Sequence, residues 1–452
     1  MKFVFLLFAV LALAYDPTWE SVDSRPLPSW FDEAKLGIFI HWSVFSVPAF
    51  KSEWYWRRLV DGEQEFVDFY KKTYGEKVKF QDLANQFTAE MYDPDHWADV
   101  FEKSGAKYVV LTSKHHEGFT LWPSKYSWNW NSQDIDKDNG FQTQEYVDKH
   151  YIPMVKELVN KYKPDVLWAD GGWEALDSYW KSPELLAWLY IIFIMLTFMF
   201  MVMFIIIYIY YYGYYKYILI TIIFIFHSIY IYIYNESPVK DTVVVNDRWG
   251  ADCSEKHGGF YSGPDRYEPG HLLPHKWESA MTIQKDCWGY DRTEDFYVDK
   301  YFSLRELLST FIPTVAYGGN LLLNIGPTAD GRIMPLMQER LIQLGDWMKV
   351  NGEAIYKSIP WRVQDEDKKV YFTERKDLSA VYAILTEWPE DNTVTLSSPQ
   401  LTENTKMSLM GSDKPVEYKQ DGEKIIVSLP HLNVKQIPCQ EFYVIKHWWA
   451  AF

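Results

Sequence analysis

Asp170 is the residue whose setting most favours chemistry. It closes the apolar run DVLWAD and is followed directly by GGW. A carboxylate among aromatic side chains is partly screened from water and can be tuned as a nucleophile or as an acid. Trp54, Trp168 and Trp173 offer apolar faces on which a sugar ring can stack. The alternative is that Asp170 caps the next helix or loop, and at this point the sequence leaves both interpretations open.

Three histidines, His41, His115 and His116, lie at or just past the ends of two other apolar runs. Adjacent histidines do not easily point at one ion, whereas an imidazole can both donate to and accept from substrate hydroxyls. A buried core histidine remains an alternative for any one of them. The three cysteines form no CxxC pair, so a structural zinc site is not expected. We therefore expect neither a metal nor a cofactor.

A second carboxylate could work with Asp170. The carboxylates near the ends of apolar runs are Glu53, Asp247, Asp265 and Glu278. A retaining glycosidase uses two carboxyls about 5 to 5.5 Å apart, one attacking the anomeric carbon and the other protonating the leaving oxygen. Sequence contains no distances, so the pair stays open.

The elements that must position these residues repeat one pattern between residues 30 and 356. Short apolar runs end in polar residues, and amphipathic stretches such as residues 145–162 lie between some of them. The runs are LGIFIHW, KYVVLTSKHHEGF, DVLWADGGW, TVVVNDRWG and NLLLNIGP. Continuous apolar runs are typical of parallel strands covered on both faces. Polar groups at their carboxyl ends are typical of the active site of a (β/α)8 barrel.

The pattern changes after Pro360. Short segments there alternate apolar and polar residues and are separated by turn residues, for example KKVYFTE, SAVYAILTEW and EKIIVSLP. This alternating pattern predicts an antiparallel β-sandwich. We therefore expect an α/β fold with two domains, a (β/α)8-like catalytic barrel at residues 15–356 and a C-terminal β-sandwich at residues 357–452.

Charge and the N-terminus restrict the setting of the protein. The formal net charge of −16 argues against a nucleic-acid partner, because phosphate binding needs a basic face. Lys2, an apolar run and the sequence ALA before Tyr15 are typical of a cleaved signal peptide at residues 1–14. The mature protein is then expected in the secretory pathway, lysosomal or secreted.

Six motifs carry a resemblance to a known family: SRPLPSWFDEAKLGIFIHWSVFSVPAF, SEWYW, GAKYVVLTSKHHEGFTLWPSKYSWNWNS, DVLWADGGWE, VVVNDRWG and GGNLLLNIGPTADG. They strongly resemble the tissue α-L-fucosidases, family twenty-nine of the glycoside hydrolases, over nearly all of residues 18–446. The resemblance implies a retaining exo-hydrolase that removes terminal α-L-fucose from glycoproteins and glycolipids. It also implies a barrel followed by a β-sandwich, with no metal requirement.

The resemblance assigns roles residue by residue. Asp170 matches the nucleophile, Asp265 is the first choice for the acid/base and Glu278 the second. Positions lining the fucose pocket are matched by His41, Glu53, Trp54, His115, His116, Trp168 and Arg248. Arg248 is a candidate neighbour that would keep the nucleophile charged.

The chain departs from the family in two places. After Ile135 a segment of about one βα unit is missing, which would leave a seam of unpaired backbone groups in the barrel. Residues 191–234 are an insertion rich in Ile, Tyr and Phe, which A/T-rich codons encode. We interpret the insertion as an unspliced intron and the gap as a skipped exon.

Alternatives to an active fucosidase are a catalytically impaired fucose-binding relative, a mis-spliced isoform, or a membrane-tethered form. Membrane association would use only residues 191–234. A homo-oligomer is possible.

Overall fold

The computed structural model of the chain describes residues 15–127, 143–190, 237–295 and 297–448. The chain divides into two compact units. One comprises Met1–Pro28 and Ser124–Gly259, called here the Asp170 unit, and the other comprises Ser29–Pro123 and Phe260–Phe452, called the His41 unit. The expected deletion after Ile135 and the insertion at 191–234 lie outside the described residues.

A four-stranded parallel sheet forms the centre of the His41 unit. Its strand order is β2 (Tyr108–Leu111), β1 (Leu36–Ile40), β6 (Gly319–Ile325) and β5 (Trp277–Thr282). The first parallel strand thus pairs directly with the last, with Phe39 opposite Asn324. Pairing of the first with the last strand is what closes a (β/α)8 barrel.

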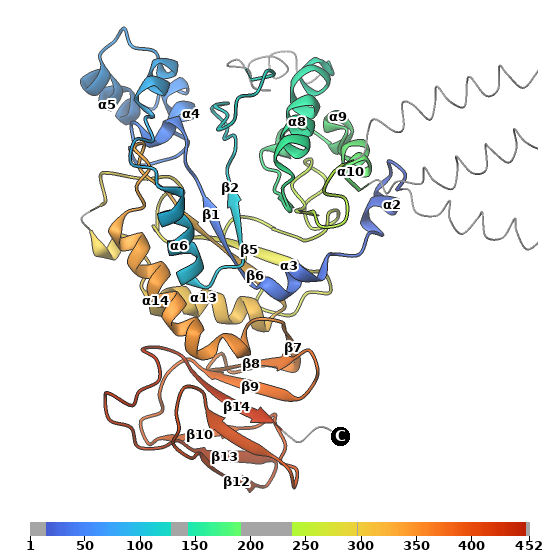
Figure 1. Cartoon of the computed structure of the whole chain (residues 1–452), viewed down its shortest axis with the longest axis vertical. Coiled ribbons are helices and arrows are strands. Elements are labelled where there is room, and N and C mark those ends of the chain that lie inside the picture. Colours follow the sequence, from blue (N-terminus) through green and yellow to red (C-terminus); the bar gives the residue numbers. More distant parts are fainter. Residues whose placement is uncertain (1–14, 128–142, 191–236, 296, 449–452) are drawn as a thin grey trace, which may run out of the picture. The chain divides into compact units, whose positions relative to one another are not determined.

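Helices α6 (Pro94–Ser104), α13 (Leu304–Ala316) and α14 (Pro335–Asn351) pack against the outer face of this sheet (Figure 1). Their ends follow from the local sequence. The Asp93 carboxylate accepts from backbone N–H groups at the start of α6, and Gly105 ends that helix in a left-handed conformation. Ser303 and Glu306 form a capping box on α13. The shorter helices of the unit are α3 (Ser29–Ala34), η2 (Val44–Ser46), α4 (Tyr55–Val60), α5 (Gln64–Tyr74), η3 (Phe80–Gln86), η6 (Val298–Lys300) and η7 (Gly352–Ala354).

Strand β2 departs from the expectation that every strand is covered on both faces. It is the edge strand of the four-stranded sheet, and Val109 and Leu111 are 45% and 44% exposed. Tyr108 and Val110 on the opposite face are buried. In β2, therefore, one face is exposed and the other is buried, whereas β1, β5 and β6 are buried along their whole length.

The C-terminal part of the His41 unit is an antiparallel β-sandwich, as the alternating pattern predicts. One sheet has the order β11 (Lys406–Leu409), β14 (Tyr443–Trp448), β9 (Ala380–Leu385), β8 (Val370–Arg375), β7 (Ser358–Glu366). The other has the order β10 (Thr393–Leu396), β13 (Lys424–Ser428), β12 (Glu417–Asp421). Their inner faces share one apolar cluster, in which Phe372, Leu396 and Ile425 are fully buried. Helix α13 packs on β7 and β8 as well as on β6.

The Asp170 unit carries a shorter parallel pair. Strand β3 (Val166–Leu167) pairs with β4 (Val244–Val245), and the Asn246 side-chain amide extends the pairing by bonding both backbone groups of Ala169. The strand is shorter than the run DVLWAD predicts because a side chain replaces the backbone ladder beyond Leu167. The helices of this unit are α2 (Trp19–Asp23), η4 (Val147–Tyr151), α8 (Ile152–Tyr162), η5 (Gly172–Glu174), α9 (Asp177–Trp180) and α10 (Ser182–Tyr190).

Helix α10 is buried on almost every side, with Leu186 and Leu189 fully inaccessible. It packs with Val243 and Val245 of the β4 region in one apolar cluster. Within the described ranges, no helix is both long and apolar enough to cross a membrane. Residues 191–234 fall outside those ranges.

An ionic cluster ties together the amino ends of three strands in the His41 unit. Lys35 precedes β1 and Lys276 precedes β5, and both ammonium groups contact Asp32 Oδ1, at 3.0 and 2.7 Å. Lys276 also donates to the carbonyl of Gly318, next to β6. Burial, together with the nearby Lys35 charge, lowers the pKa of Lys276 to about 7. Although burial acts in the opposite direction, the two lysines lower the pKa of Asp32 to about 2.

Replacing Gly345 in α14 by Ala tests the contact between α14 and α6. A Gly-to-Ala change inside a helix normally stabilises by up to about 1 kcal/mol. Here a Cβ at Gly345 would lie 1.7 Å from the Lys103 carbonyl oxygen of α6. We expect Gly345→Ala to destabilise the protein by about 1–3 kcal/mol, since the helices must separate. Urea unfolding measures this, with Lys349→Ala on the exposed face as a control that changes stability by less than about 0.5 kcal/mol. A more stable Gly345→Ala protein would contradict the close packing.

Replacing Asp32 by Asn tests the ionic cluster. The variant leaves the buried lysines without their shared carboxylate. We expect the free energy of unfolding to fall by about 1–3 kcal/mol at pH 5, less than for a fully buried pair, because the Asp32 side chain is 39% exposed. Lys276 stays protonated up to pH about 10 in the unfolded chain, so burying it in its uncharged form requires removing a proton. The free-energy cost of removing that proton falls as the pH rises. We therefore expect a smaller loss at pH 8.5 than at pH 5 in urea unfolding. Equal losses at both pH values would argue against the cluster.

Candidate active site

The carboxyl ends of β1 and β6 bring His41 and Asn324 together. The backbone N–H of His41 donates to the Ile325 carbonyl, and His41 Nδ1 lies 2.6 Å from Asn324 Oδ1. The Asn324 amide then donates to the Trp288 carbonyl at 2.6 Å, and the Trp288 ring lies 5.3 Å from the His41 ring. Because an amide oxygen only accepts, His41 carries a proton on Nδ1 and directs Nε2 away from Asn324.

Glu53 is a buried carboxylate beside these histidines. Its Oε2 accepts from the backbone N–H of Trp288 at 3.0 Å, and the Cys287 thiol lies 3.3 Å away. Burial raises its pKa, but backbone hydrogen bonds and the positive charge available on His115 and His41 outweigh burial, and the net shift is downward. Glu53 is thus held as an anion. Cys287 shows the opposite effect, since burial and the Glu53 charge raise the pKa of its thiol well above normal.

Trp54 packs on both members of the histidine pair. Its ring stacks on His116 with centroids 4.1 Å apart, and it meets His115 edge to face at 5.7 Å. His115 in turn lies 5.8 Å from His41. The structure therefore gathers five sequence-predicted residues into one cluster, namely His41, Glu53, Trp54, His115 and His116. A cluster of imidazoles, an anionic carboxylate and indole faces can bind a polyhydroxylated ring through its hydroxyls and its apolar face.

Glu117 completes the environment of His115 and was missed by the sequence analysis. Its side chain is 3% exposed, its Oε2 lies 3.0 Å from His115 Nδ1, and its Oε1 accepts from the Ser43 hydroxyl. Burial alone would raise its pKa, but the hydrogen bond and charge of His115 and the Ser43 bond lower it overall. The signal available in sequence was adjacency, since Glu117 follows His116 directly.

In the Asp170 unit the ion pair of Asp170 with Arg248 is the central feature. Arg248 donates from Nη1 to Asp170 Oδ1 at 3.0 Å, and its guanidinium lies 4.7 Å above the Trp168 ring. Gly172 makes this arrangement possible, because a Cβ there would lie 2.9 Å from the Arg248 carbonyl oxygen. The Asp170 side chain is 35% exposed and is open to a reactant. Trp173 nearby in sequence is 51% exposed.

The two candidate acid/bases lie in different places, Asp265 on a loop and Glu278 on β5. Asp265 is exposed on a loop that is anchored beside the strand by the bond from Arg266 N–H to the Ala280 carbonyl. Glu278 is fully buried near the amino end of β5, and its carboxylate accepts from the Tyr108 hydroxyl. A group that protonates a leaving oxygen must reach substrate at the carboxyl ends of the strands. Glu278, the second residue of β5, lies near the opposite end of that strand.

Asp247, the remaining carboxylate considered from sequence, is fully buried, and its Oδ2 accepts from the backbone N–H of Glu255. It braces the loop after β4.

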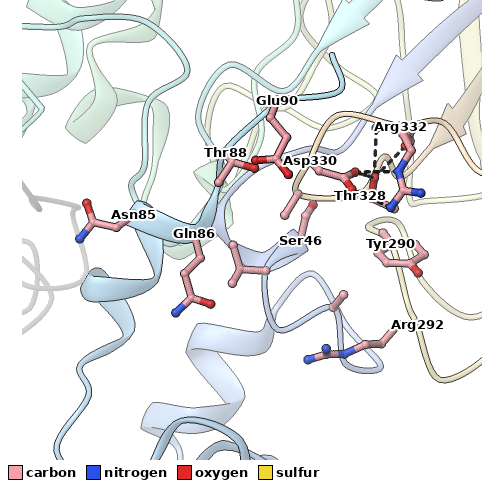
Figure 2. A pocket seen from close by; sticks show the side chains of 13 residues that line it. Ser46, Asn85, Gln86, Thr88, Glu90, Tyr290, Arg292, Thr328, Asp330 and Arg332 are labelled. Carbon is pink, nitrogen blue, oxygen red and sulfur yellow. Dashed lines mark hydrogen bonds and ion pairs between the residues drawn. The ribbon is translucent and has the colours of Figure 1, made fainter. Parts of the chain in front are cut away.

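A pocket of about 510 Å³ lies on the loops after β1, β5 and β6 (Figure 2). It contains none of the sequence-predicted site residues. Its lining combines side chains of η3 and its flanking loop, including Gln86, with Tyr290, Asp330 and Arg332. Asp330 and Arg332 are paired with each other at 2.6 Å, and the lining also contains one further residue of each charge, Glu90 and Arg292.

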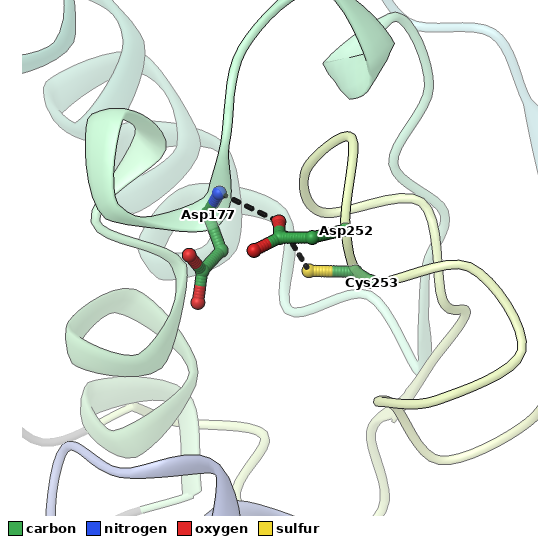
Figure 3. A group of neighbouring side chains, drawn as sticks. All are labelled: Asp177, Asp252 and Cys253. Atoms are coloured by element: carbon green, nitrogen blue, oxygen red, sulfur yellow. Dashed lines mark hydrogen bonds between the residues drawn. The ribbon is translucent and has the colours of Figure 1, made fainter.

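Among the described residues, one group has the spacing of metal ligands: Asp177, Asp252 and Cys253 (Figure 3). Asp252 Oδ1 already accepts from the Asp177 backbone N–H, and Asp177 Oδ2 accepts from the Trp19 indole. Burial and the surrounding carboxylates raise the pKa of the Cys253 thiol to about 12, whereas metals bind the thiolate. The group is best explained as a hydrogen-bonded brace around the start of α9.

Comparison with known proteins identifies a family along almost the whole chain. The α-L-fucosidase family model matches residues 9–140, 133–195 and 225–353, and the α-L-fucosidase C-terminal domain model matches residues 364–447. The match breaks near residue 135, and it leaves residues 196–224 unmatched. The break near residue 135 coincides with the expected deletion, and the unmatched residues lie within the expected insertion at 191–234.

Curated relatives agree with this assignment. The chain is 42% identical to the tissue α-L-fucosidase of Rattus norvegicus, with 96% of this chain and 92% of the relative covered. It is 41% identical to the tissue α-L-fucosidase of Homo sapiens, covering 96% and 91%. The plasma α-L-fucosidase of Rattus norvegicus is 43% identical, covering 96% and 94%.

Solved structures support the fold as well. The α-fucosidase of Thermotoga maritima superimposes with a TM-score of 0.71 at 29% identity, covering 96% of this chain and all of the other. Its complex with fucose gives a TM-score of 0.70. The expected α/β fold, a (β/α)8-like barrel followed by an antiparallel β-sandwich, is confirmed, and the chain belongs to the α-L-fucosidase family of glycoside hydrolases.

Proposed function

We propose that this chain is a retaining exo-α-L-fucosidase that removes terminal α-L-fucose from the glycans of glycoproteins and glycolipids. The observation that carries the proposal is the ion pair of Asp170 and Arg248, in which an exposed carboxylate lies 3.0 Å from a guanidinium. The family match of the chain extends over nearly its full length. A charged, accessible carboxylate is what a glycosidase nucleophile requires.

The reaction has two steps. Asp170 attacks C1 of fucose, the bond from C1 to the glycosidic oxygen breaks, and the acid/base carboxyl gives its proton to that departing oxygen. The same carboxylate, now charged, then takes a proton from water, and the water oxygen attacks C1 and releases Asp170. We assign the acid/base role to Asp265 and keep Glu278 as the second choice. Fucose itself would be held by His41, Glu53, Trp54, His115, His116, Trp168 and Arg248.

The wider setting is part of the proposal. The relatives are tissue and plasma fucosidases, which supports a lysosomal or secreted enzyme with a signal peptide at residues 1–14. We retain the domain limits of 15–356 and 357–452 and possible homo-oligomerisation. The partners are fucosylated glycans, without a cofactor. Tethering to a membrane has no support from the described residues.

Replacing Asp170 by Asn tests the nucleophile. The amide keeps the shape and can still accept a hydrogen bond from Arg248, but it cannot form the ester intermediate. We expect hydrolysis of 4-nitrophenyl α-L-fucoside to fall on the order of 1,000-fold or more, without a matching loss of thermal stability. Asp241→Asn, an exposed carboxylate in the same unit, serves as the matched control and should leave the rate unchanged. Undiminished turnover by the Asp170 variant would exclude the assigned role.

The acid/base assignment has its own test, because an activated leaving group needs little protonation. We expect Asp265→Asn to hydrolyse a fucosylated oligosaccharide about 100- to 10,000-fold more slowly than the wild type. The bond-breaking step with 4-nitrophenyl fucoside should slow far less, which pre-steady-state release of nitrophenol measures. Glu278→Gln, if it folds, should affect both substrates alike. If Glu278→Gln shows the leaving-group dependence and Asp265→Asn does not, the roles are reversed.

A further inference from the structure

The chemistry of Glu117 and His115 determines which of the two donates the hydrogen bond between them. An ionised carboxylate can only accept hydrogen bonds, and Oε2 of Glu117 lies 3.0 Å from His115 Nδ1. Nδ1 of His115 must therefore be the donor, whether the ring is neutral or charged. With the proton fixed on Nδ1, the neutral ring presents Nε2 as an acceptor, and the charged ring presents it as a donor.

The Glu117 carboxylate is held so that it cannot turn away from His115. Its other oxygen, Oε1, accepts from the hydroxyl of Ser43, which is itself 1% exposed and directly follows Trp42 at the end of the β1 run. The side chain of Glu117 is 3% exposed, so water does not compete for either oxygen. Burying a carboxylate is costly unless it is paired and hydrogen-bonded, and here both conditions are met.

The His115 ring is also restrained on its other sides. Phe45 meets it edge to face at 5.0 Å, Trp54 at 5.7 Å and His116 at 4.6 Å. These ring contacts restrict rotation of the His115 ring, but edge-to-face packing does not select between its two nitrogens. Only a directional polar partner does that, and Glu117 is such a partner.

We propose that Glu117 is a positioning residue of the fucosidase reaction, which fixes the proton of His115 on Nδ1 and directs Nε2 to a hydroxyl of the fucose ring. This inference rests on the proposed function, in which His115 lines the fucose pocket. Glu117 does not touch substrate and acts through His115. Its relation to His115 parallels that of Asn324 to His41, where an amide oxygen takes the place of the carboxylate.

Kinetics of Glu117→Gln provide the first test. The amide keeps the size of the side chain but loses its charge, and it can either accept from Nδ1–H or donate to Nδ1, so the proton position is no longer fixed. We expect kcat/KM for 4-nitrophenyl α-L-fucoside to fall about 10- to 100-fold, as for loss of a charge-assisted hydrogen bond. Ser43→Ala keeps the carboxylate beside His115, so its kcat/KM should fall less than that of Glu117→Gln. Unchanged kcat/KM in a folded Glu117→Gln protein would overturn the proposal.

A double-mutant cycle separates action through His115 from a general structural effect. If Glu117 acts only through His115, the variant Glu117→Gln/His115→Ala should be no slower than His115→Ala alone. Losses that multiply would show that Glu117 acts independently and would refute the positioning role. Melting temperatures of all variants control for unfolding.

A spectroscopic measurement keeps the proposal testable even if the Glu117 variant fails to fold. Nitrogen-15 NMR of histidine-labelled wild-type protein, with His115 assigned by its loss in His115→Asn, reports which ring nitrogen carries the proton. We expect Nδ1 to be protonated. A neutral ring protonated on Nε2 would overturn the inference. If wild-type protein does not hydrolyse the fucoside, the proposed function fails, whereas this measurement still decides the state of His115.

Discussion

The pairing of β1 with β6 is the constraint on which the histidine cluster depends. Its register places Ile40 opposite Ile325, so the next residue, His41, lies beside Asn324 and donates a hydrogen bond from Nδ1 to the Asn324 amide oxygen. Because side chains alternate between the two faces of a strand, a slip of one residue would turn His41 toward the helices and break that bond. The strands themselves are held by apolar packing on α6, α13 and α14. Distant parts of the chain thus meet at one strand end.

Electrostatics then determines what this strand end can do. Glu53 and Glu117 are both buried, and each would favour the neutral acid if burial acted alone. Interactions with His115 counter burial in both cases, and the pKa of each carboxyl is lowered. The carboxylates and imidazole therefore stabilise one another in their charged or hydrogen-bonded forms. Hydrogen bonds within such a cluster also leave its side chains few alternative rotamers. The side chains are therefore already positioned before a sugar binds.

Much of this arrangement was predictable because it depends on strand ends. Apolar runs that finish in His41 or lead to His115 indicate where polar groups collect, and Asp170 with Arg248 follow two further runs. Asn324, Trp288 and Glu117 were not predicted. These residues matter because of the specific atoms that they contact. Those contacts depend on the β1–β6 register and on the paths of the loops, which sequence patterns do not reveal. The strand β3 was predicted, but its short length was not, because the Asn246 side chain replaces the backbone pairing beyond Leu167.

The contrast between Glu278 and Asp265 shows why residue type alone does not identify a catalytic acid. Both are carboxyls near the same strand in sequence. Glu278, however, is the second residue of β5, lies opposite Asn320 near the start of β6, and bonds Tyr108 at the start of β2. Burial and the Glu278 charge raise the pKa of Tyr108 well above normal, so that hydroxyl stays a donor and the carboxylate is committed to it. This bond joins β5 to β2 at the amino end of the sheet, whereas the active site of a (β/α)8 barrel lies at the carboxyl ends of its strands.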